Sequence, residues 1–95
     1  MSKHQTVYQE MLTANPDLFS SFKMVHAQFA SDKNTFRLKF NEIGEQVVDT
    51  IRKYEKILCA KTDSGGYGKY SSGLSDRFWE NVKRDFPLID FVGVE

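Results

Sequence analysis

The stretch FRLKFNEIGEQVVDTIRKYEKIL, residues 36–58, decides the fold because its large apolar residues recur with the period of an α-helix. At about 100° per residue they fall within one narrow arc of a helical wheel. We call this set the apolar stripe; its members are Phe36, Phe40, Ile43, Val47, Ile51, Tyr54 and Leu58, with Ile57 just beside it. The pattern predicts one helix over residues 34–61, which would be roughly 40 Å long at about 1.5 Å per residue.

The beginning of this stretch also fits a β-strand, because residues 35–40 (TFRLKF) alternate strictly between polar and apolar. Leu38 distinguishes the two readings. In a strand it would share a face with Phe36 and Phe40, whereas in a helix it would point away from the apolar stripe. We favour the helix, since Phe36 and Phe40 continue the helical period that follows them.

Two shorter helices are expected before the long one. The first covers residues 2–14 and ends at Asn15, because the residue before a proline is driven out of the α region. Asn15 and Pro16 then form a start signal for a helix over residues 16–31, with Asn15 as its N-cap and Pro16 in the first helical position. Its apolar face holds Leu18, Phe22, Val25 and Phe29, flanked by Phe19 and His26.

A fourth helix is expected after a glycine-rich connector at residues 62–74. Ser75 is the predicted N-cap, and Pro87 follows the end of the helix. The apolar tail, residues 88–94, fits one or two further helical turns stopped by Gly93, or else a short strand. Either form should dock on the body of the protein. The whole chain, residues 1–95, is therefore expected to be a single all-α domain: a small four-helix, bundle-like fold with one long central helix and a short apolar C-terminal segment.

Composition excludes several classes of protein. Thirteen basic residues balance thirteen acidic ones, which argues against attachment to nucleic acid through an excess of positive charge. The single cysteine, Cys59, can form no intrachain disulfide, and it leaves too few thiols for a cysteine-based zinc site. The N-terminal MSKHQTVYQE lacks the apolar run of a signal peptide, and no run of 18 apolar residues suggests a membrane span. A cytoplasmic protein is expected.

The glycine-rich stretch TDSGGYGKYSSG, residues 62–73, resembles a phosphate-binding loop only superficially. A Walker A loop needs Ser or Thr after its Gly-Lys pair and a glycine five positions before that pair's glycine. Here Tyr70 follows Lys69, and the earlier position is Asp63. The stretch is therefore either a plain connector or a recognition loop. In the second case the candidate protein-binding residues are Tyr67, Lys69 and Tyr70, with Arg77 beside them.

No constellation of catalytic residues is apparent. Cys59 and His26 are expected to border the core rather than form a nucleophilic pair, and no spacing of His, Cys or acidic residues is typical of a metal site. We therefore expect no cofactor, no metal, no evident small-molecule ligand and no enzymatic activity. The sequence favours a protein-binding adaptor whose partner is another protein or a second copy, the latter if the shorter helices leave part of the apolar stripe uncovered.

The alternative is a nucleic-acid-binding regulatory protein that uses the basic residues of the long helix. These are Arg37, Lys39, Arg52, Lys53, Lys56 and Lys61.

Overall fold

The computed structural model describes the backbone of residues 2–63 and 71–93, and the side chains of residues 2–58 and 73–93. These ranges hold four α-helices, one 3₁₀ turn and no strand. The elements are α1 (Lys3–Ala14), α2 (Pro16–Ser31), α3 (Lys33–Asp63), α4 (Ser71–Asp85) and the turn η2 (Ile89–Phe91). The expected all-α fold is confirmed.

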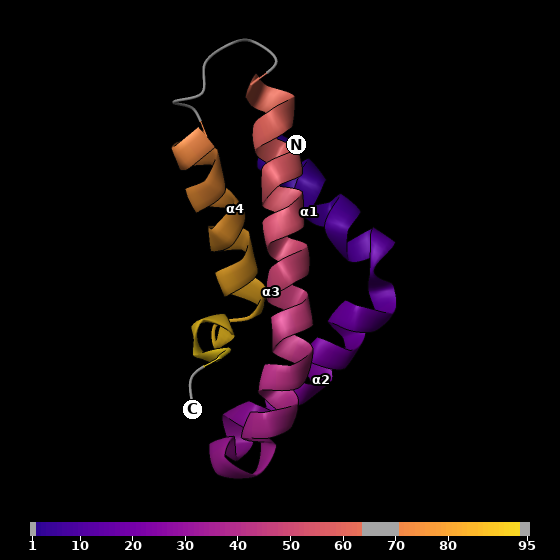
Figure 1. Cartoon of the computed structure of the whole chain (residues 1–95), viewed down its shortest axis with the longest axis vertical. Coiled ribbons are helices and arrows are strands. Elements are labelled where there is room, and N and C mark those ends of the chain that lie inside the picture. Colours follow the sequence, from indigo (N-terminus) through magenta and orange to yellow (C-terminus); the bar gives the residue numbers. More distant parts are fainter. Residues whose placement is uncertain (1, 64–70, 94–95) are drawn as a thin grey trace.

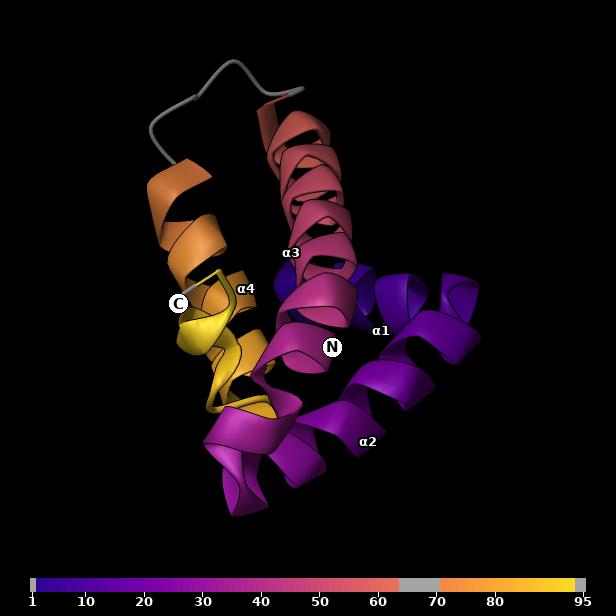
Figure 2. The same ribbon diagram turned by 60° about the horizontal axis from the view of Figure 1, so that its bottom comes forward.

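The long helix α3 is the axis of the molecule (Figure 1). The protein is 47 Å in its longest dimension, about the length of this 31-residue helix at roughly 1.5 Å per residue. Helix α4 runs antiparallel beside the C-terminal half of α3, while α1 and α2 form a bent pair on the other side (Figures 1 and 2). Every other element therefore packs on the helix that the apolar stripe predicts.

Leu38 settles the choice between helix and strand at residues 35–40. Its exposed fraction is 85%, whereas Phe40, two positions later, is completely buried. Both values fit a helix, in which these two residues point in nearly opposite directions. The prediction of a helix here is confirmed, and the strand alternative is wrong.

The neighbouring helices cover the apolar stripe. Four of its members are completely buried, and the others, including Ile57 beside it, are half-buried. The buried members are Phe40, Val47, Ile51 and Leu58. No member of the apolar stripe among residues 36–58 is exposed. The stripe therefore offers no uncovered part of the kind that would favour a second copy of the chain as the partner.

Asn15 is the N-cap residue of α2, as predicted, but without the side-chain hydrogen bond of a cap, and the predicted start of α4 after Ser75 is wrong. The side-chain amide of Asn15 donates instead to the carbonyl oxygen of Met11, at 2.9 Å, and so closes the end of α1. Helix α4 begins at Ser71 rather than after Ser75, which shortens the expected connector. The extra turn brings Leu74, half-buried, against the core from within the helix.

The apolar tail docks on the body, as expected, but as a single 3₁₀ turn rather than a strand. Ile89 is buried in the main core. Gly93 has a positive φ of 86°, and its N–H donates to Asn41 Oδ1 on α3 at 3.0 Å. Glycine adopts a positive φ readily because it has no Cβ atom.

Aromatic rings form the centre of the core. Phe29 and Phe40 stack with their ring centroids 4.0 Å apart and their planes 8° from parallel. Phe22 lies between Phe40 and Phe86, at 5.5 and 5.0 Å between centroids. This cluster joins α2, α3 and the end of α4. It also fixes the position of Phe86, which faces the recess described next.

Candidate functional site

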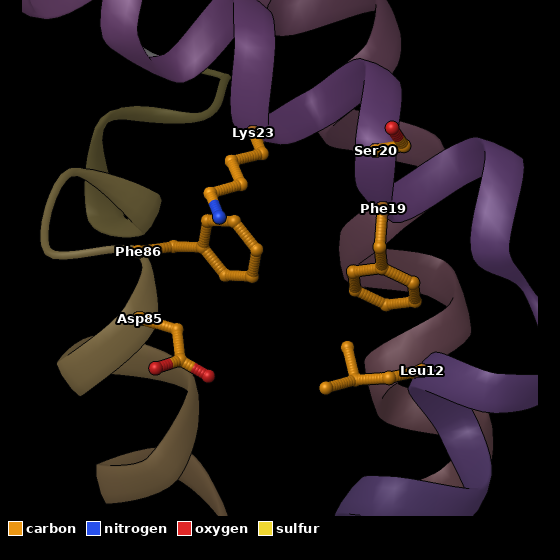
Figure 3. Close-up of a pocket in the computed structure, with 6 residues that line it drawn as sticks. All are labelled: Leu12, Phe19, Ser20, Lys23, Asp85 and Phe86. Carbon is orange, nitrogen blue, oxygen red and sulfur yellow. The ribbon is translucent and has the colours of Figure 1, made fainter.

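An open recess lies where α1, α2 and the end of α4 meet (Figure 3). Helices α1 and α2 meet at an angle at Asn15 and Pro16 (Figure 2), and both helices contribute lining residues to the recess. Its volume is about 360 Å³. We call it the three-helix pocket; its lining residues are Leu12, Phe19, Ser20, Lys23, Asp85 and Phe86.

The walls of the three-helix pocket are apolar. Phe19 from α2 and the rim residue Phe86 pack against each other with ring centroids 6.2 Å apart and together form one apolar wall. Both rings are almost completely buried, so the pocket meets mainly their edges. Leu12, half-buried at the end of α1, closes another side. The recess therefore suits the tip of one large apolar group.

Two opposite charges flank these walls, and they differ in their surroundings. Asp85 accepts a hydrogen bond from the buried Tyr8 hydroxyl at 2.6 Å, and the Arg84 Nε lies 3.7 Å from its other oxygen. Lys23 has no acidic side chain within ion-pair distance among the described residues. Its ammonium group points toward the pocket from the α2 side (Figure 3). Lys23 is therefore the charged lining residue that has no partner of opposite charge among the described residues.

Tyr8 holds Asp85 in place. Burial, with the hydrogen bond to Asp85 and the negative charge of that carboxylate, raises the pKa of Tyr8 far above its usual value. The hydroxyl consequently stays protonated and remains a donor. The Tyr8 hydroxyl thus holds the Asp85 carboxylate on the α4 side of the pocket, although the two residues are 77 positions apart in the chain.

His26 supports the Phe86 wall from behind. Its ring lies 5.8 Å from that of Phe86, between centroids, and packs also against Phe22 and Phe40. The Leu88 backbone N–H donates to His26 Nε2 at 3.1 Å. A backbone N–H can only donate, so Nε2 is unprotonated and the ring proton of the neutral imidazole is assigned to Nδ1. Burial lowers the pKa of His26, in agreement with this neutral form.

We expect His26 to make the stability of the protein depend on pH. The folded-state pKa lies below the ordinary value of about 6.5, so the unfolded chain binds more protons in the window between these two pKa values. The free energy of unfolding should be constant above about pH 6.5 and should fall as the pH drops below it. Thermal unfolding between about pH 7.5 and 5.5, where histidine is the side chain that ordinarily titrates, measures this.

The control uses the second histidine of the chain. Replacing His26 with Gln should flatten the pH dependence, whereas replacing His4 with Gln should preserve it. A flat profile in the unmodified protein, or a loss of the dependence only in the His4 variant, would show that the Leu88–His26 contact does not select the neutral ring.

Of the protein-binding residues predicted from sequence, Arg77 is the one that the structure describes, and it does not line the three-helix pocket. Tyr67, Lys69 and Tyr70 lie outside the described residues. Arg77 is exposed on α4, eight positions before Asp85, which is about 12 Å along a helix. The structure therefore does not bring Arg77 to the pocket, and the loop residues remain a prediction.

The basic residues of α3 do not form one surface. Arg37 is half-buried, whereas Lys39, Arg52, Lys53 and Lys56 are exposed; the side chain of Lys61 lies outside the described residues. At about 100° per residue the described five are spread over more than half of the helix circumference. Exposed acidic side chains lie among them, namely Glu42, Glu45 and Asp49.

Among the described residues, no three His, Cys, Asp or Glu side chains lie close enough to hold a metal ion. The same part of the chain contains no helix that is both long and apolar enough to cross a bilayer.

The fold and the site thus define a small helical protein with a preformed recess that is apolar inside and charged at its rim. Comparison of the chain with models of protein families, with curated proteins and with solved structures gave no match.

Proposed function

We propose that this chain is a non-enzymatic interaction module that binds another protein, and that a large apolar side chain of the partner inserts into the three-helix pocket. The observation that carries the proposal is the recess of about 360 Å³ whose lining combines the apolar Leu12, Phe19 and Phe86 with the charged Lys23 and Asp85. Pockets that accept apolar groups begin at about 300 Å³, and a few anchor residues in such pockets supply most of the binding energy of an interface.

The rim of the pocket supports binding rather than catalysis. Ser20 carries the one hydroxyl among the lining residues, and it points away from the recess (Figure 3). Asp85 is occupied by Tyr8, and no described nucleophile lies beside a base inside the pocket. Charged groups around an apolar centre are the usual composition of a protein interface.

Two further elements belong to this proposal. Tyr67, Lys69, Tyr70 and Arg77 are proposed as a second, separate contact with the partner. We also propose that the protein is cytoplasmic. The single cysteine, Cys59, can form no intrachain disulfide, and disulfides are rare in cytosolic proteins.

A photo-crosslinking amino acid at position 20 tests the site. Ser20 is exposed at the rim, so a benzophenone side chain there would reach a bound partner. We expect a discrete crosslinked product in native lysate. The same group at position 42, an exposed residue of α3, should give no such product, and Leu12→Trp, which fills the pocket, should abolish the product from position 20.

Thermal unfolding of the Leu12→Trp variant shows whether its fold is retained. If that fold is lost, Lys23→Glu replaces it as the variant that tests the pocket, because Lys23 is exposed. A product of twice the mass of the chain would identify a second copy as the partner. Equal products from positions 20 and 42 would contradict the proposal. The same assay with Tyr67, Lys69 and Tyr70 changed to Ala tests the loop.

A further inference from the structure

We infer that the three-helix pocket selects an acidic partner segment, one in which a large apolar residue is next to a carboxylate. This inference rests on the proposed function and adds the chemistry of the partner. It follows from the two charged residues at the rim. The negative one, Asp85, has partners inside the molecule, whereas the positive one, Lys23, has no acidic partner among the described residues.

The Asp85 carboxylate already has partners inside the molecule. Its two oxygens face the Tyr8 hydroxyl at 2.6 Å and Arg84 Nε at 3.7 Å. A cation from a partner would have to share the carboxylate with these two groups. Asp85 therefore attracts an incoming positive charge less than a carboxylate without partners would.

Lys23 has the opposite character. No described acidic side chain lies within ion-pair distance of it, and its ammonium group points toward the recess (Figure 3). The residue is exposed, so a partner carboxylate can approach it without burying either charge. An ion pair of this exposed kind contributes modestly to affinity and strongly to the choice between charged partners.

The two charges also orient the partner. Lys23 lies on α2 and Asp85 at the end of α4, on different sides of the apolar walls (Figure 3). With an apolar side chain of the partner against the exposed edges of Leu12, Phe19 and Phe86, the neighbouring carboxylate is attracted toward Lys23 and repelled from Asp85. The pocket should therefore favour one direction of the bound segment.

Three N-acetylated, C-amidated dipeptides test the inference by NMR titration of the ¹⁵N-labelled full chain. Trp-Glu carries both features, Trp-Gln lacks only the charge, and Ala-Glu lacks the apolar anchor. We expect Trp-Glu to shift the backbone signals around Phe19, Lys23 and Phe86, and to bind roughly two- to fivefold more tightly than Trp-Gln, the effect of one exposed ion pair. Ala-Glu should cause no saturable shift.

A matched pair of lysine variants assigns the effect to Lys23. In Lys23→Gln, Trp-Glu and Trp-Gln should bind equally, at the affinity of Trp-Gln for the unmodified protein. In Lys39→Gln, which removes an exposed lysine of α3 instead, the preference for Trp-Glu should remain. Both positions are exposed, so the spectra should show a retained fold.

The possible failures are distinguishable. Equal binding of Trp-Glu and Trp-Gln to the unmodified protein would overturn the acidic preference and leave the apolar anchor of the proposed function intact. No binding of either Trp dipeptide would overturn both the preference and the pocket as an anchor site. Shifts that follow protein concentration rather than added dipeptide would show that a second copy occupies the pocket, which would also overturn the inference.

Discussion

Replacing Phe40 with Ala is expected to lower the free energy of unfolding by about 3–5 kcal/mol. Phe40 is completely buried, stacks on Phe29 at 4.0 Å between ring centroids and lies 5.5 Å from Phe22. Removing its ring eliminates apolar burial and leaves a cavity that the neighbouring rings, held by several elements, cannot fully close. Small domains have only about 5–15 kcal/mol of stability in total, so this loss should leave the variant marginally stable.

Urea unfolding followed by circular dichroism measures the effect, with Leu38→Ala as the matched control. Leu38 lies two positions away on the same helix but has an exposed fraction of 85%. Its replacement should change the free energy of unfolding by no more than about 0.5 kcal/mol. Similar losses in the two variants would contradict the helical assignment of residues 35–40, because in a strand the two side chains would share one face.

Replacing Gly44 with Ala is expected to destabilise the protein by about 1 kcal/mol, although the same change inside an exposed helix normally stabilises by a similar amount. Gly44 is buried on α3 beneath the C-terminal tail. A Cβ atom at this position would lie 2.6 Å from Val92 Cγ2 and 3.0 Å from Val92 Cγ1. Valine is short and stiff, so the tail itself must move away from α3.

The decisive measurement is a double-mutant cycle with Val92→Ala. In that background the two colliding methyl groups are absent, and the next neighbour, Phe22 Cε1, is at a tolerable 3.4 Å. Gly44→Ala should then stabilise the protein by about 0.5–1 kcal/mol, so its effect changes sign. Hydrogen exchange at Gly93, whose N–H donates to Asn41, should become faster in the single Gly44 variant. Stabilisation by Gly44→Ala in the otherwise unmodified chain would show that the tail does not pack on α3.

Much of the fold could be predicted from the sequence because helices depend on local pattern. The apolar stripe predicts α3 within two residues of its observed ends, and the Asn15–Pro16 pair marks the junction of α1 and α2 correctly. The structure departs from the predicted caps where a residue has more than one available partner. Asn15 is able to cap either adjacent helix, and Ser75 is able to start α4 or lie within it.

The candidate site was much less accessible to sequence analysis. Phe19 was expected only to flank the apolar face of its helix, and Lys23 and Asp85 carried no recognisable signal. Lys23 and Asp85 are 62 positions apart in the chain, and no short motif joins them. The residues that did stand out, Tyr67, Lys69 and Tyr70, lie outside the described residues, so their role remains a prediction.

The sequence by itself determined which segments are helical and which face of each turns inward, because a repeat of about 3.6 residues is a property of neighbours along the chain. Only the tertiary structure decided that Tyr8 would hold Asp85, that His26 would receive the Leu88 N–H, and that a recess would remain beside Lys23. These contacts join residues 62 to 77 positions apart. They depend on the angles at which the helices cross, which are set by how side chains interlock and not by the pattern within any one helix.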